Sequence, residues 1–294
     1  MVYHSLKEIC LLAENENSSF WQIICQDDCM ERQITQSQSF EMMLHMYEAM
    51  EKADRNYAPE RKSPSRMAGG DGEKLKNYTE TGKNLSGAFI GRVMEKAVKM
   101  AETNACMGRI VAAPTAGSCG VLPAVLLTYE EFFDCSREKM AQALYTAAGI
   151  GQIIAERASI AGASGGCQAE IGSASAMAAG ALTFLQGGDG RRICDAVAIS
   201  LKGLLGLTCD PVAGLVEVPC VKRNVIGAVN AVTSTDMVMA GVTSVIPADE
   251  VIDAMGEIGR DMPRKFKETS EGGLAVTPAA QAIEEQIRLS EEQI

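Results

Sequence analysis

Histidine is almost absent from this chain of 294 residues, which contains only His4 and His45. Both lie near the N-terminus, far in sequence from the Gly-rich motifs described below. This scarcity disfavours a Ser–His–Asp triad, which needs a histidine base beside its nucleophile. It also disfavours zinc sites that combine histidine with cysteine.

Aromatic residues and positive charge are also scarce. Aromatic residues make up 5% of the chain, and low aromatic and β-branched content disfavours a sheet protein. The formal net charge is −11 and the pI is about 4.8, so no basic face is visible for nucleic acid. We therefore expect no nucleic-acid partner.

No apolar run is long enough to cross a bilayer, and stretches such as 120–129 fall well short of that length. The N-terminus also lacks a basic start followed by an apolar signal core. We expect no membrane association and a cytoplasmic protein, in which the ten cysteines remain reduced thiols.

Helical periodicity dominates the rest of the chain. Apolar residues recur at spacings of three and four in 39–53, and similar patterns predict further helices at 85–106, 122–133, 137–158, 173–185, 191–205, 225–240 and 247–260. Ser173 is expected to cap its helix. The polar, Pro- and Gly-punctuated segment 54–72 predicts a long loop, and only 214–218 indicates an extended segment. The tail from residue 280 is expected to be a terminal helix or frayed.

The sequence thus predicts an all-α fold, a multi-helix globular catalytic domain whose Gly-rich turns bind ligands. Two divisions of the chain remain open at this point. Either 1–61 is a separate N-terminal helical segment before a catalytic domain at 62–294, or 1–294 is one continuous domain.

Three cysteines stand out because each lies near Gly or Pro, where the chain turns: Cys167, Cys209 and Cys220. Three thiolates without a fourth partner suit an iron–sulfur cluster with one open iron, which is a Lewis acid. Their separations of 42 and 11 residues contain no close pair of the kind that structural zinc uses. The simpler alternative is that each is a buried structural cysteine. Cys25 and Cys29 lie one helical turn apart, but they and most remaining cysteines are typical of core or surface positions.

The turn at 112–123 reads Ala-Ala-Pro-Thr-Ala-Gly-Ser-Cys-Gly-Val-Leu-Pro. Thr115 and Ser118 offer hydroxyls, and Gly117 lets the backbone approach a ligand. The helix that follows could hold a carboxylate at its first amides, although an ordinary capped turn explains the same residues. The Gly-rich run at 69–75 lacks the Gly-Lys-Ser/Thr ending of a phosphate loop.

Together these motifs resemble a known family. The residues are Pro-Thr-Ala-Gly-Ser at 114–118, Gly-Gly-Cys-Gln-Ala-Glu-Ile-Gly-Ser-Ala at 165–174, and Cys-Asp-Pro-Val-x-Gly-Leu-Val-x-Val-Pro-Cys at 209–220. Gly-Gly-Asp at 69–71 and Glu-x-Asn-Ala-x-Met-Gly at 102–108 also match. From about residue 66 onward the chain resembles the α subunit of bacterial iron–sulfur-dependent L-serine dehydratase, an L-serine ammonia-lyase. Residues 1–61 carry less of the resemblance.

The resemblance implies an all-helical domain with a [4Fe–4S] cluster bound by Cys167, Cys209 and Cys220, which converts L-serine to pyruvate and ammonia. Cys119 departs from the small residue expected after Ser118, and no ligand role is carried onto it. The chain has no room for the regulatory domain of single-chain members. We therefore expect a separate β subunit and a hetero-oligomer.

Substrate-binding residues follow from the same resemblance. The substrate carboxylate would be held by Thr115, Gly117 and Ser118. A second set of substrate contacts would come from Gly69, Gly70 and Asp71.

The general base is the least determined part of the site. A base tuned near neutral pH is often histidine, but neither histidine lies in a motif. Lys74 and Glu170 are the candidates within this chain, and a serine alkoxide or a group from the β subunit also remains open. Alternative functions are a related iron–sulfur lyase acting on L-cysteine or L-threonine, a non-catalytic iron–sulfur redox or sensor protein, or a helical scaffold with structural thiols.

Overall fold

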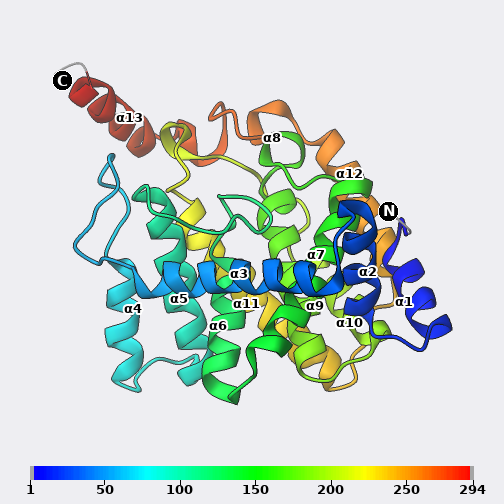
Figure 1. Cartoon of the computed structure of the whole chain (residues 1–294). Coiled ribbons are helices and arrows are strands. Elements are labelled where there is room, and N and C mark those ends of the chain that lie inside the picture. Colours follow the sequence, from blue (N-terminus) through cyan, green and yellow to red (C-terminus); the bar gives the residue numbers. More distant parts are fainter. Residues whose placement is uncertain (1–2, 292–294) are drawn as a thin grey trace.

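The computed structural model describes residues 3–291, and within that range the chain is all-α, as predicted (Figure 1). Its thirteen α-helices are α1 (Leu6–Asn15), α2 (Phe20–Arg32), α3 (Gln36–Arg55), α4 (Asp71–Glu80), α5 (Gly87–Ala105), α6 (Val121–Phe133), α7 (Arg137–Arg157), α8 (Gly162–Gly165), α9 (Ser173–Leu185), α10 (Gly190–Lys202), α11 (Cys220–Met239), α12 (Ala248–Asp261) and α13 (Pro278–Glu291). A π-helical segment, η1 (Gln168–Gly172), precedes α9, and short 3₁₀ turns are η2 (Val212–Gly214), η3 (Arg264–Phe266) and η4 (Gly273–Val276).

Helix α9 forms the centre of the molecule. Every one of its residues is buried, and it contacts α6, α7, α10 and α11. A helix that is apolar on all sides belongs inside a core. Its Ala, Ser and Gly residues let the neighbouring helices approach, and a Cβ at Gly180 would lie 2.2 Å from Ile150 Cδ1. Small residues at this helix therefore fix how tightly the bundle packs.

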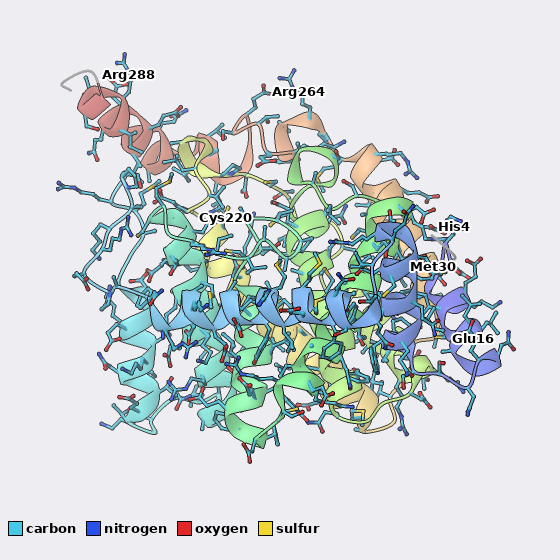
Figure 2. All side chains as sticks on the ribbon, viewed as in Figure 1. His4, Glu16, Met30, Cys220, Arg264 and Arg288 are labelled. Atoms are coloured by element: carbon cyan, nitrogen blue, oxygen red, sulfur yellow. The ribbon has the colours of Figure 1, made fainter. Side chains whose placement is uncertain are left out.

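The N-terminal helices pack on the same core. Figure 1 shows α3 running across one face of the molecule, with α1 and α2 beside its N-terminal end. Buried side chains of this region, such as Leu6, Ile24 and Tyr47, belong to one apolar cluster with residues of α7, α9 and α10. The division at residue 61 stays a prediction. Helix α13 lies at the opposite edge and extends away from the body (Figures 1 and 2).

Several boundaries differ from those expected. The predicted loop 54–72 ends early because α4 begins at Asp71, and α11 begins at Cys220, five residues before the expected start. Segment 214–218 is not a strand: Gly214 ends the 3₁₀ turn η2, Leu215 alone has extended backbone, and 216–218 form bends and a turn. Ser173 is not an N-cap, because α9 continues directly from η1 and the buried Ser173 hydroxyl has no hydrogen-bond partner.

Among residues 3–291, no helix is both long and apolar enough to cross a bilayer.

Candidate active site

The three predicted thiols come together although they lie on separate segments. Cys167 directly precedes η1, Cys209 lies in the loop after α10, and Cys220 is the first residue of α11. Their exposed fractions are only 3%, 3% and 8%. Burial, together with negative charge on Cys167 and Glu170, raises the pKa of Cys220 to about 12. The pKa of Cys209 is raised by burial and by the charges of Cys167, Glu170 and Cys220, so all three sulfurs share one electrostatic environment.

The Cys209 loop is fixed by the segment after α12. The Cys209 N–H donates to the Phe266 carbonyl at 2.8 Å, and its carbonyl accepts from the Glu268 N–H at 3.1 Å. Asp210 adds a carboxylate contact, since its Oδ2 accepts from the Leu274 N–H at 2.8 Å. The backbone position of Cys209 therefore depends on residues more than fifty positions later in the chain.

Arg223 binds this loop and places a positive charge near the other thiols. It lies three residues after the last quoted motif and was not predicted from the sequence. Its Nη1 donates to the Thr208 carbonyl at 2.7 Å and its Nη2 to Asp210 Oδ1 at 2.8 Å. The positive charge of the guanidinium also acts on the Cys167 thiol. Burial raises the pKa of Cys167 to about 11, and the positive charge of Arg223 partly opposes that rise. Arg223 thus supplies a positive charge that acts on both Cys167 and Cys220.

Glu170 lies between the thiols and the turn at 114–118. It belongs to the π-helical segment η1, a geometry that often occurs at functional sites. Its Oε1 accepts a hydrogen bond from Thr115 Oγ1 at 2.7 Å. A Cβ at Gly117 would lie 3.0 Å from Oε1, and one at Gly162 would lie 2.8 Å from Oε2. The two glycines therefore make room for the carboxylate, whose pKa is raised by burial and lowered in part by the Thr115 hydroxyl.

The turn itself has free backbone donors. Thr115 Oγ1 and Ser118 Oγ lie 3.0 Å apart, and Ser118 is fully buried. The amides of Ala116 and Gly117 make no hydrogen bond within residues 3–291. Adjacent unpaired amides in a turn form a concavity that suits an anion such as a carboxylate. This arrangement supports the predicted binding role of Thr115, Gly117 and Ser118.

Asn224 holds this turn against the start of α11. Its Oδ1 accepts from the Gly120 N–H at 2.8 Å, and its Nδ2 donates to the carbonyls of Gly117 at 2.8 Å and Cys220 at 2.9 Å. The side chain is completely buried. The sequence offered a signal: Asn224 follows Cys220 by four residues and so lies on the same helical face. This spacing is informative only if the helix is predicted to begin at Cys220 and not at residue 225.

The turn at Gly69, Gly70 and Asp71 is closed by an internal carboxylate. Glu102, which is 1% exposed, accepts from the amides of Gly69 at 3.0 Å, Asp71 at 2.9 Å and Gly72 at 3.2 Å. Gly70 has a φ of +83°, which favours glycine. Because Glu102 already occupies these amides, substrate contact from this turn would have to come from the Asp71 side chain or from the Gly70 amide.

Lys74 lies on the solvent side of the same turn. Its Nζ donates to Asp71 Oδ1 at 2.8 Å, and Lys222 donates to Asp71 Oδ2 at 2.7 Å. These two ammonium groups lower the pKa of Asp71 to about 2, and the Asp71 charge raises the pKa of Lys74. Lys74 is therefore an exposed, protonated ion-pair partner, whereas Glu170 is the candidate base that lies with the thiols.

Among the described residues, no three histidine, cysteine, aspartate or glutamate side chains lie close enough together to hold one metal ion. A four-iron cluster is larger than one ion and spaces its thiolates farther apart. All ten cysteines are free thiols.

Comparison with known proteins identifies the family. The profile of the family described as serine dehydratase alpha chain matches residues 15–275. The chain is 45% identical over 286 residues to a probable L-serine dehydratase, alpha chain, of Bacillus subtilis, covering 97% of this chain and 95% of that protein. It is 46% identical over 218 residues to the L-serine dehydratase, alpha chain, of Peptoniphilus asaccharolyticus, covering 74% and 75%. An L-serine dehydratase of Helicobacter pylori is 36% identical over 281 residues, which are 94% of this chain but 62% of that longer protein. The match extends further toward the N-terminus than the motifs indicated. The resemblance inferred from the motifs is confirmed, and this chain belongs to the serine dehydratase alpha chain family.

Proposed function

We propose that this chain is the catalytic α subunit of an L-serine dehydratase, a carbon–nitrogen lyase that converts L-serine to pyruvate and ammonia. The observation that carries the proposal is the meeting of Cys167, Cys209 and Cys220 with Glu170 beside a turn that has free amides. Membership of the family supplies the substrate and the reaction.

The three thiols would hold a [4Fe–4S] cluster. The donor set fits, because three buried thiolates repel one another and resist ionisation until positive charge is placed among them. Bound there, the cluster would supply a Lewis acid that helps the substrate β-hydroxyl to leave.

The turn at 114–118 would bind the substrate carboxylate. The amides of Ala116 and Gly117 are unpaired donors, and the hydroxyls of Thr115 and Ser118 lie beside them. A carboxylate at this position would place Cα of serine near the Glu170 carboxyl group, which Thr115 also contacts.

Glu170 would remove the α-proton. Its pKa is raised by burial, which makes it a stronger base than a solvated glutamate. The electron pair of the broken Cα–H bond forms the Cα–Cβ double bond as the β-hydroxyl leaves. The released aminoacrylate tautomerises and hydrolyses to pyruvate and ammonia. Lys74 is the weaker candidate, since its exposed ammonium is held protonated by Asp71. The turn at Gly69, Gly70 and Asp71 would border the substrate pocket.

A separate β chain would complete the enzyme in a reducing cytoplasm. Two relatives are described as alpha chains, and the Helicobacter pylori relative has additional length in one polypeptide. The ten free thiols suit a reducing compartment.

The test is anaerobic reconstitution of the chain, with and without the β chain, followed by iron and sulfide counts and pyruvate formation. Cys167→Ala, Cys209→Ala and Cys220→Ala should each lose the cluster and the activity. Cys25→Ala is the matched control, because Cys25 is equally buried but lies on α2. Normal iron content in the Cys209 variant would refute the ligand assignment. Comparing L-serine with L-cysteine and L-threonine decides between the lyase alternatives, and iron binding without turnover of any of them would favour a redox or sensor protein.

A further inference from the structure

A cavity of about 540 Å³ lies between α3 and the C-terminal end of α5. None of the three thiols and no residue of the turn at 114–118 lines it. Its cationic lining residues are Lys52, Arg61 and Arg109, its acidic ones are Glu48 and Glu102, and His45 and Tyr57 line it too. Segment 57–61 closes one side, and the turn after α5 closes another.

The positive charges of this cavity are only partly neutralised. The side chains of Arg61 and Arg109 are exposed and make no hydrogen bond or ion pair within residues 3–291. Lys52 has a long contact of 3.8 Å with Glu48. Both oxygens of Glu102 are already occupied, by backbone amides and the Tyr57 hydroxyl. Two unpaired guanidinium groups therefore face one concavity in a chain of net charge −11.

A second cavity shows that this charge pattern is not a consequence of size. It has a volume of about 570 Å³ and lies beside the start of α10. Its only cationic lining residue is Arg191, and Glu14 and Asp189 line it too. The cavity between α3 and α5 differs from it because three cationic side chains line it: Lys52, Arg61 and Arg109.

We propose that the cavity between α3 and α5 binds a small multivalent oxyanion, held by Arg61, Arg109 and Lys52. Guanidinium groups recognise phosphate and carboxylate oxygens through paired, charge-assisted hydrogen bonds. The shared chemistry is a cluster of anionic oxygens, whether from a phosphate ester or from a di- or tricarboxylate. This proposal stands independently of the reaction proposed above.

An occupant of this cavity would touch the side chains that fix the turn at residues 69–72. Tyr57 and Glu102 line the cavity, and Glu102 accepts the amides of Gly69, Asp71 and Gly72. Ligand binding should therefore slow hydrogen exchange at these amides, because it restricts the opening that exposes them to solvent. Asp71 in turn pairs with Lys222 on α11, which gives the cavity a physical connection to the helix that begins at Cys220.

The experiment is calorimetric titration of the purified full chain with pyrophosphate and with citrate, at low ionic strength. Arg61→Gln and Arg109→Gln should each weaken binding by about tenfold or more, as expected for loss of one charged hydrogen-bonding partner. Arg191→Gln is the matched control, since it removes an exposed, unpaired arginine at the other cavity. Circular dichroism and thermal unfolding confirm that the variants remain folded.

A second readout locates the ligand. Cys106 lines the cavity and is mostly buried, so an occupant should slow its alkylation, while alkylation of Cys135 should be unchanged. Binding of pyrophosphate alone would identify phosphate as the recognised group, and binding of both probes would identify anionic charge. The proposal is overturned if neither probe binds at millimolar concentration, if Arg191→Gln weakens binding as much as the other variants, or if Cys106 is not protected.

Discussion

Replacing Asn224 by alanine tests whether the candidate active site is held together by one side chain. Asn224 joins the turn that carries Gly117 to the first residue of α11, Cys220, through three hydrogen bonds of 2.8 to 2.9 Å. Asn224→Ala removes all three. The Gly120 N–H and the Gly117 carbonyl are then left without a partner in a buried environment.

The size of the effect follows from those lost partners. A buried polar group without a hydrogen bond destabilises the fold by about 1–3 kcal/mol, so two such groups give a loss of about 2–4 kcal/mol when relaxation is included. Catalysis should suffer more, because the carboxylate-binding amides and the Cys220 thiol would shift relative to each other. A misplacement of this kind lowers kcat/KM by on the order of a hundredfold. Asn224→Asp should be no better, since it turns a carboxylate oxygen toward two carbonyl groups.

A matched control lies on the same helix. Asn230 is also on α11 and donates to Ser175 Oγ at 2.9 Å and to the Ser200 carbonyl at 3.0 Å, away from the thiols. Urea unfolding should show comparable losses for Asn224→Ala and Asn230→Ala. Only the Asn224 variant should lose iron on gel filtration and fall in kcat/KM. If the two variants match in iron content and turnover, the positioning argument is wrong.

Three further predictions follow from individual contacts. Thr115→Val removes the hydroxyl that stabilises the ionised Glu170 carboxylate, so the pKa of Glu170 should rise and the acidic limb of the kcat/KM profile should move to higher pH; an unmoved limb would argue against Glu170 as the base. Gly166→Ala places a Cβ 2.6 Å from Met262 Sδ at a φ of +76°, and should lower the free energy of unfolding in urea by about 1–3 kcal/mol, more than Gly187→Ala, whose φ is +82° but whose surroundings are open. Air should inactivate the reconstituted enzyme, with partial recovery after anaerobic treatment with ferrous iron and a thiol, whereas stable activity in air would contradict an open iron.

The sequence predicted features that depend on local chemistry. The helix at 173–185 was placed correctly because its apolar, small-residue pattern is continuous. Cys167, Cys209 and Cys220 were singled out because glycine and proline mark turns, and the structure gathers them. Glu170, Thr115 and Ser118 lie within the same motifs, and the structure shows the Thr115 hydroxyl contacting both Glu170 and Ser118; their roles stay predictions.

Features that depend on contacts between distant segments were missed. The start of α4 at Asp71 follows two glycines that favour a loop, and the helix N-terminus is satisfied by Glu102 from α5. The start of α11 was placed late because Pro219 precedes Cys220 and the first turn is polar. That error hid Arg223 and Asn224, whose roles become visible only once the helix includes Cys220.

The first turn of α11 joins the separate motifs of the candidate active site. Cys220 supplies a thiol, Arg223 binds the Cys209 loop and its charge acts on Cys167, and Asn224 binds the turn at Gly117. Lys222, on the exposed side of the same turn, pairs with Asp71. A single helical turn thus contacts loops that are distant in sequence, and it adds to direct contacts between those loops such as the Thr115–Glu170 hydrogen bond. Residues that share partners in this way do not contribute independently, so the loss of one contact weakens the others. The same reasoning explains the polar residues in the first turn of α11: Lys222, Arg223 and Asn224 each contact a different loop.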